Sequence, residues 1–148
     1  MIRTARNQDI KQIVALGQMA WGESRFSEAS GVDVPLSKGI LLNTIAGDTT
    51  AAIVSEENGI LDGVILGNVS NMYEVTDLPV VTHHLWYVTP GARPGTAMKL
   101  LDALHDWAGP ATLKRHLVHD AIVDPEKSRK LFERRGYRLA GYLYEKED

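Results

Sequence analysis

Residues 87–97 read Tyr-Val-Thr-Pro-Gly-Ala-Arg-Pro-Gly-Thr-Ala, and residues 98–108 read Met-Lys-Leu-Leu-Asp-Ala-Leu-His-Asp-Trp-Ala. The first part predicts an apolar strand end and a glycine-containing turn, and the second has the apolar spacing of an amphipathic helix. The apolar residues on that helix face are Ala97, Leu100, Leu101, Leu104, Trp107 and Ala108. The first N–H groups of a helix lack helical partners, and the helix dipole adds positive charge there. Together with Arg93, they predict a site for a phosphate-bearing ligand.

The composition is that of an ordinary folded domain. The 148 residues are 44% hydrophobic and 24% charged, which predicts a single domain over residues 1–148. No cysteine is present, so disulfides, thiolate catalysis and thiolate metal sites are excluded. The net charge of −3, without a dense basic tract, argues against nucleic-acid binding. We find neither an apolar run of ~18 residues nor a basic segment before an apolar block, so we expect no membrane span, no signal peptide and a cytoplasmic location.

The hydrophobic periodicity predicts a mixture of strands and helices along the whole chain. The predicted strands cover residues 2–6, 50–55, 60–68, 82–88, 112–123 and 137–144. The predicted helices cover residues 10–22, 35–47, 97–108 and 125–136. Asp9 and Asp124 are suited to the N-cap positions of their helices, and Gly136 ends the last helix. This order predicts an α/β fold of the mixed α+β kind, with helices on both faces of the sheet.

Two motifs at this spacing resemble the GNAT superfamily of N-acetyltransferases. The family's phosphate loop has the pattern Q/R-x-x-G-x-G/A after a V-x-P lead-in, and Val88, Gly95 and Ala97 match it. Ala92 stands at the first motif position; alternatively the loop is one residue shorter and Arg93 is the matching arginine. Residues 131–137, Leu-Phe-Glu-Arg-Arg-Gly-Tyr, are similar to the family's C-terminal L-Y-E-K-x-G-F/Y. The resemblance implies a mixed, mostly antiparallel central sheet of about six to seven strands with helices on both faces.

The resemblance also implies acetyl-CoA, or another acyl-CoA, as co-substrate. The N–H groups of Gly95, Thr96 and Ala97 are placed to hold its pyrophosphate, with Arg93 adding a charge-assisted contact. Pro94 has no N–H, so the loop has one donor fewer than usual. The other expected cofactor-binding residues are Val88 and Thr89 at the strand end, and Ser128 and Phe132 on the last helix.

Catalysis by direct transfer needs a base for the amine, a donor for the thioester carbonyl and a proton for the leaving thiolate. We expect His84 to be the base, with His83 the second choice, because histidine titrates near neutral pH. The family's usual acid is a tyrosine at the position of Phe132, which has no proton to give. Water, Tyr137 or another tyrosine then acts, or the thiolate leaves unassisted.

The acceptor site of the family lies between the early helices and the loop after the third strand. The resemblance would therefore bring Trp21, Glu23, Arg25 and Phe26 near Tyr73 and Glu74. The carboxylates would attract an ammonium group, and the aromatic rings would enclose it. A metal site at His116, His119 and Asp120 is rejected, because residues i and i+3 of a strand face opposite sides. We expect no metal.

The sequence therefore predicts an N-acetyltransferase that moves an acetyl group from acetyl-CoA to a primary amine in a ternary complex. A degenerate GNAT-like domain, acting as a non-catalytic CoA-binding or protein-interaction module, is the alternative. A third reading treats residues 91–95 as a plain turn in a fold without CoA. The sequence does not reveal the oligomeric state; dimers are common among proteins of this resemblance, so a homodimer is one option.

Overall fold

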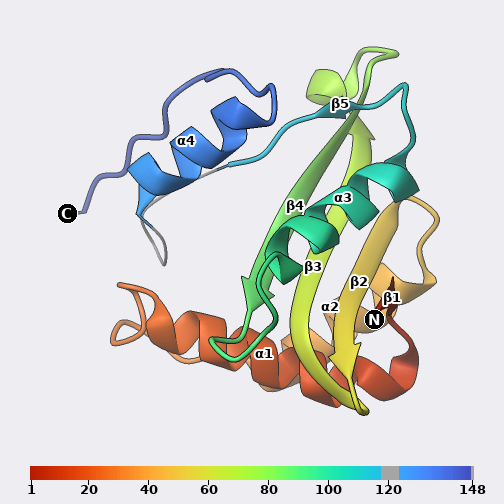
Figure 1. The fold of residues 1–148 in the computed structure, drawn as a ribbon, viewed down its shortest axis with the longest axis vertical. Helices are drawn as coiled ribbons and strands as arrows, with labels where there is room; N and C mark the ends of the chain where they lie inside the picture. The colour runs from red at the N-terminus through yellow and green to blue at the C-terminus, as the bar shows by residue number, and fades with distance from the viewer. Residues whose placement is uncertain (118–123, 148) are drawn as a thin grey trace.

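The computed structural model describes residues 1–117 and 124–147, and they form one mixed sheet with helices on both faces (Figure 1). The strands are β1 (Ile2–Thr4), β2 (Thr50–Glu57), β3 (Ile60–Asn71), β4 (Pro79–Val88) and β5 (Leu113–Lys114). The helices are α1 (Ile10–Glu23), α2 (Val34–Ala46), α3 (Thr96–Ala108) and α4 (Pro125–Arg134), with short 3-10 helices η1 (Asn7–Asp9) and η2 (Met72–Glu74). The sheet order is β1-β2-β3-β4-β5, antiparallel except for the parallel pair β4 and β5. The predicted helices and fold class are confirmed.

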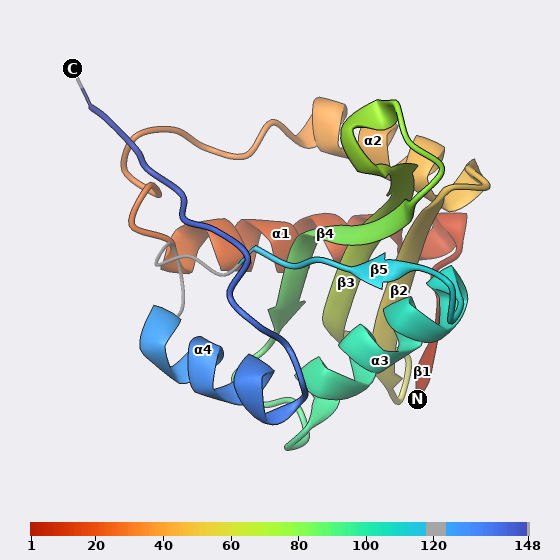
Figure 2. The ribbon, with the colours of Figure 1, turned by 90° about the horizontal axis from the view of Figure 1, so that it is seen from above.

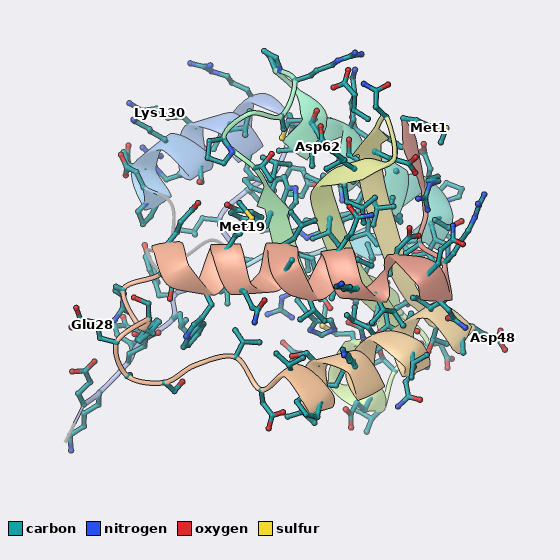
Figure 3. The ribbon with its side chains drawn as sticks, turned by 90° about the horizontal axis from the view of Figure 1, so that it is seen from below. Met1, Met19, Glu28, Asp48, Asp62 and Lys130 are labelled. Atoms are coloured by element: carbon teal, nitrogen blue, oxygen red, sulfur yellow. The ribbon has the colours of Figure 1, made fainter. Side chains whose placement is uncertain are left out.

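Each face of the sheet has its own hydrophobic core. Helices α1 and α2 cover one face of the sheet. Helix α3 covers the other face, and α4 lies next to α3 on that side (Figure 2). Figure 3 views the molecule from below, with α1 and α2 together on one side of the sheet and the loop carrying Glu28 between them. Strand β3 supplies both cores, because Val64 packs among α1 side chains and Ile65 packs among α3 side chains. This alternation follows from the two-residue period of a strand.

Two glycines of β3 let α3 pack directly on the sheet. A Cβ on Gly67 would lie 2.6 Å from Leu104 Cδ1 and 2.8 Å from the carbonyl oxygen of Thr82. A Cβ on Gly63 would lie 2.9 Å from Leu100 Cδ1. Leu100 faces Gly63 and Leu104 faces Gly67, so two leucines on one face of α3 pack over the two glycines of the strand. This packing fixes where α3 begins relative to the end of β4.

A β-bulge interrupts β4 in the middle of the predicted histidine pair. Leu85 pairs with Leu66 but His83 pairs with Gly67, so His84 is the extra residue. Because of this bulge, the two-residue period of the strand does not hold between His83 and the residues after it. The His83 and Trp86 rings contact each other edge to face, with centroids 5.6 Å apart, although three residues separate them.

The last two predicted strands differ from the structure. Of the strand predicted over 112–123, only Leu113–Lys114 is formed in the described part, and residues 118–123 lie outside it. The strand predicted over 137–144 is absent, since the described residues after α4 form no strand. Large side chains there, including Tyr142 and Tyr144, are exposed, so no apolar face is buried to stabilise a strand. The sheet of the described residues has five strands, not six to seven.

None of the helices within residues 1–117 and 124–147 combines the length and apolar character that a membrane span requires.

Candidate functional site

The turn before α3 presents backbone donors at the helix N-terminus. Gly95 is the N-cap with φ of +84°, a conformation that favours glycine, and a Cβ there would meet open space. The N–H of Thr96 donates to the carbonyl of Arg93 at 3.1 Å, and the N–H of Lys99 donates to Gly95 at 3.0 Å. Within the described residues, the N–H groups of Ala97 and Met98 are left without a backbone partner. They are the donors of an anion site.

Two predicted phosphate ligands, Arg93 and Thr96, do not present their side chains to a ligand in this structure. Arg93 forms an ion pair with Glu57, on the hairpin that joins β2 and β3. Both side chains are exposed, so the pair is weak and is easily exchanged for another anion. Thr96 is buried, so its hydroxyl is not presented to a ligand at the surface. The predicted contribution of Thr96 is therefore limited to shaping the turn.

In the part of the chain that the structure describes, the outer edge of β4 is open beside this turn. Among residues 1–117 and 124–147, β5 pairs with β4 only at Val80 and Val81, and Figure 1 shows β5 beside one end of β4. The N–H of Thr89 donates to Asp62 of β3 at 2.8 Å. Because successive N–H groups of a strand point to opposite sides, the N–H of Val88 points away from β3. An extended ligand that carries amide groups can pair with such an edge.

Helix α4 borders the same side of the molecule. Ser128 is half-buried and lines an open groove of about 320 Å³ with Asp124, Lys127 and Leu131. Phe132 is buried, and its ring packs edge to face on Trp86, with centroids 6.0 Å apart. The structure therefore places Ser128 at a surface groove and Phe132 in the core.

One of the predicted acceptor residues at the end of α1, Glu23, contacts β4. The Tyr87 hydroxyl donates to Glu23 Oε1 at 2.6 Å. Burial, with the hydrogen bond and negative charge of Glu23, raises the pKa of Tyr87 to about 12, so this hydroxyl keeps its proton. The Trp21 and Phe26 rings stack with centroids 6.4 Å apart, and the Arg25 guanidinium lies 4.0 Å above Phe26. The Glu23 carboxylate therefore lies beside the end of β4, and the stacked Trp21 and Phe26 rings lie within three residues of it in the sequence.

Tyr73 and Glu74 are not brought to this place. They lie in η2, next to Asn71 and Pro79, at the end of the β3–β4 pair opposite Val88. The length of β4 puts that end roughly 30 Å from Val88, and Figure 1 shows the two ends of β4 at opposite ends of the sheet. Tyr73 and Glu74 are far from Val88 because they lie in the loop that joins the antiparallel strands β3 and β4.

The two neighbouring histidines of β4 have different surroundings. His84, the predicted base, is exposed at the bulge. His83 Nδ1 lies 2.7 Å from His116 Nδ1, and His116 Nε2 lies 2.8 Å from His105 Nε2. The Tyr137 hydroxyl lies 3.1 Å from His105 Nε2. The sequence gives no signal for this cluster, because its members come from separate elements with no common spacing.

One buried carboxylate oxygen near the turn has no hydrogen bond in the described part of the chain. It is Oδ1 of Asp62, the residue labelled at the start of β3 in Figure 3. A buried carboxylate oxygen without a donor is costly, so its position marks a place for water or for a ligand donor. No sequence pattern pointed to Asp62.

Comparison with known proteins identifies the fold. No family model and no curated protein matches the sequence. Among solved structures, the aminoglycoside N-acetyltransferase AAC(6')-Iy in complex with CoA is similar, with a TM-score of 0.78, 16% identity, and coverage of 100% of this chain and 93% of that one. A ribosomal-protein-alanine N-acetyltransferase from Brucella melitensis biovar Abortus gives a TM-score of 0.68 at 19% identity, covering 100% and 98% of the two chains. A predicted acetyltransferase with acetyl-CoA from Clostridium acetobutylicum gives 0.73 at 15%, covering 99% and 95%.

The chain therefore has the fold of these acetyltransferases over nearly its whole length. This is the fold that the resemblance to the GNAT superfamily implies, and the predicted fold class is confirmed apart from the strand count.

Proposed function

We propose that the protein is an acyl-CoA-dependent N-acyltransferase that moves an acetyl group from acetyl-CoA to a primary amine. The observation that carries the proposal is the position of the α3 N-terminus, whose open N–H groups adjoin the open edge of β4. A ligand with phosphates at one end and an extended amide arm at the other fits this combination. The similar structures that contain CoA or acetyl-CoA support the same ligand.

In this proposal, the N–H groups of Ala97 and Met98 bind the pyrophosphate, and Arg93 leaves Glu57 to add its charge. The amides of the pantetheine arm pair with the outer edge of β4, and Ser128 contacts the arm from α4. The N–H of Val88 donates to the thioester carbonyl oxygen, where negative charge develops during transfer.

The acceptor binds between the end of α1 and the end of β4. The Glu23 carboxylate, held by Tyr87, attracts the ammonium group and takes one proton from it. The neutral amine nitrogen then forms a bond to the carbonyl carbon while the carbon–sulfur bond breaks. The second amine proton passes to the thiolate through water, because Phe132 has none to give.

His84 remains a second candidate base, but its position on β4 is less favourable. Four residues of an extended strand separate it from Val88, or roughly 13 Å. A base must lie within hydrogen-bond reach of the amine, directly or through one water. Glu23 meets this condition more readily, since its partner Tyr87 is the neighbour of Val88.

The alternative function is a CoA-binding or protein-interaction module without catalysis. Two observations favour it: Phe132 is a core residue without a proton to give, and Ala92 occupies the first position of the phosphate motif. Release of free thiol from acetyl-CoA, measured over a panel of amines, separates the two functions. The proposal expects amine-dependent release that Glu23→Gln reduces by tenfold or more. Tight acetyl-CoA binding with no release for any amine would instead establish the module.

A further inference from the structure

Three histidines from three elements form a continuous chain of ring-to-ring hydrogen bonds. His83 belongs to β4, His105 to α3, and His116 follows β5. His116 lies between the other two, with its Nδ1 at 2.7 Å from His83 and its Nε2 at 2.8 Å from His105. The Tyr137 hydroxyl contacts the His105 end at 3.1 Å. The chain therefore connects β4, β5, α3 and the segment after α4.

The chain begins where the pairing of β4 and β5 ends. Val81 and Lys114 form the last register pair, and the Arg115 N–H donates to the Val81 carbonyl at 3.0 Å. His83 and His116 each follow that pair by two residues, so their side chains lie on the same face of the two strands. Their hydrogen bond holds the strands together one step beyond the backbone ladder.

The geometry suits shared protons and not a metal ion. Each contact joins one ring nitrogen to one other, and the ring centroids are 4.9 Å and 5.0 Å apart. A metal site needs several donors that converge on one point. In the described residues, no group of three or more His, Asp or Glu side chains is arranged to hold a metal ion. A neutral imidazole has one donor and one acceptor nitrogen, so a neutral His116 completes the chain by donating to one neighbour and accepting from the other.

The surroundings oppose an added proton. Burial, and then the neighbouring His83 and His105, lower the pKa of His116 to about 3. Burial and the charge of Lys114 lower the pKa of His105. The other charged groups that act on His105 are Asp102 and Asp106 of α3, which favour protonation, and Arg135 after α4, which opposes it. Arg135 is also paired with Asp102, which offsets part of both charges.

We propose that this histidine chain is an acid-sensitive clasp, which holds β5 and α3 against β4 when neutral and releases the strand junction when it gains a proton. A doubly protonated His116 donates at both nitrogens, and any neighbour that also faces it with an N–H is repelled. Opening of the junction between β4 and β5 would widen the space beside the outer edge of β4. The inference concerns the junction itself and does not depend on acyl transfer.

Hydrogen exchange of the Arg115 amide tests the clasp directly. His116 favours the open junction at low pH, because the exposed imidazole binds protons near pH 6.5 and the clasped one does not. Between pH 8 and pH 5 the opening equilibrium should rise by up to about 30-fold, after correction for the intrinsic exchange rate. The Val69 amide, which donates to Thr49 away from the histidines, is the internal reference and should show no such rise.

Two variants sharpen the measurement. His116→Phe keeps a planar ring but cannot gain a proton, and it should abolish the pH dependence at Arg115. His84→Gln removes a histidine of the same strand outside the chain and should leave that dependence intact. If His116→Phe does not fold, nitrogen-15 spectra of the wild-type histidine rings replace it, and they should show His116 neutral at pH 5. Equal pH dependence at Arg115 and Val69, or protonation of His116 near pH 6.5, would overturn the proposal.

Discussion

The Tyr87 hydroxyl donates a 2.6 Å hydrogen bond to Glu23 Oε1, so the last residue of α1 is tied to β4 one residue before that strand ends. This hydrogen bond joins the end of α1, which also carries Trp21, to β4. It also gives Glu23 a fixed position beside Val88, which an exposed carboxylate would not otherwise have.

Replacing Tyr87 by Phe should weaken acceptor binding while the fold persists. Loss of the hydroxyl removes one hydrogen bond to a charged group, worth about 1.5–3 kcal/mol at most and less here because Glu23 is exposed to water. We expect KM for the amine to rise about tenfold with KM for acetyl-CoA unchanged, in steady-state kinetics. Tyr73→Phe, at the far end of the sheet, is the matched control. An equal effect of the two variants would remove Tyr87 from the acceptor site.

The same tyrosine predicts a loss of stability at alkaline pH. The pKa of Tyr87 is raised from 10.0 to about 12, so the folded state keeps a proton that the unfolded chain releases. Its stabilising contribution is complete below pH 10 and declines as pH rises towards 12. Urea unfolding of the wild type between pH 9 and 12 should show this decline, and Tyr87→Phe should make it shallower. Parallel curves for the two proteins would contradict the assignment.

Gly67 is required by the packing of α3. In Gly67→Ala, the new Cβ meets Leu104 and the Thr82 carbonyl, and overpacking of this kind costs about 1–3 kcal/mol. Gly39→Ala in α2 is the control, because its Cβ meets nothing within 4 Å and alanine favours a helix. Urea unfolding should show a lower free energy of unfolding for the first variant and an unchanged or higher one for the second. A neutral Gly67→Ala would show that α3 can shift on the sheet.

At the start of α1, a buried carboxylate predicts acid sensitivity. Asp9 accepts hydrogen bonds from the Arg3 guanidinium at 2.7 Å and from the Arg6 N–H at 2.7 Å. The Arg3 hydrogen bond, more than any other cause, lowers the pKa of Asp9 below 3.8. Its contribution is therefore present above pH 3.8 and is lost as pH falls through the lowered value. Asp9→Asn should reduce the free energy of unfolding at pH 7 and make its decline at acid pH shallower. An unchanged decline at acid pH would contradict this role of Asp9.

Much of the fold was predictable from the sequence, because its helices carry local signals. Asp33 and Asp124 cap α2 and α4 by accepting from the N–H groups of Leu36 and Glu126. The bulge at His84 was not predictable, since it depends on how β4 pairs with β3. The final strand was predicted and is absent, because alternation alone does not bury a face.

The candidate site was predictable only in part. The turn at Gly95 follows β4, as the resemblance implies, and Glu23 lies beside the end of β4. Tyr73 lies far from Glu23 because the loop between β3 and β4 is at the opposite end of that antiparallel pair. The His105–His116 contact joins segments with no shared pattern. Such contacts arise from tertiary packing, which leaves no periodic pattern of residues in a single sequence.

The ion pair between Arg93 and Glu57 predicts how the loop exchanges partners. Glu57→Gln should tighten acetyl-CoA binding, because Arg93 no longer has to leave a carboxylate. Arg93→Gln should weaken binding and reduce its dependence on salt. Titrations at two salt concentrations measure both effects. If Glu57→Gln instead weakens binding, Arg93 does not meet the phosphates.

Whether the turn before α3 binds the pyrophosphate is tested by calorimetric titration with acetyl-CoA. Gly95→Glu places bulk and negative charge beside the Ala97 and Met98 donors. Gly109→Glu makes the same change at the other end of α3, where the glycine also has a positive φ and open space around it. We expect the wild type and Gly109→Glu to bind acetyl-CoA, and Gly95→Glu to lose this binding. No binding by the wild type at millimolar ligand, or equal binding by Gly95→Glu, would contradict this expectation.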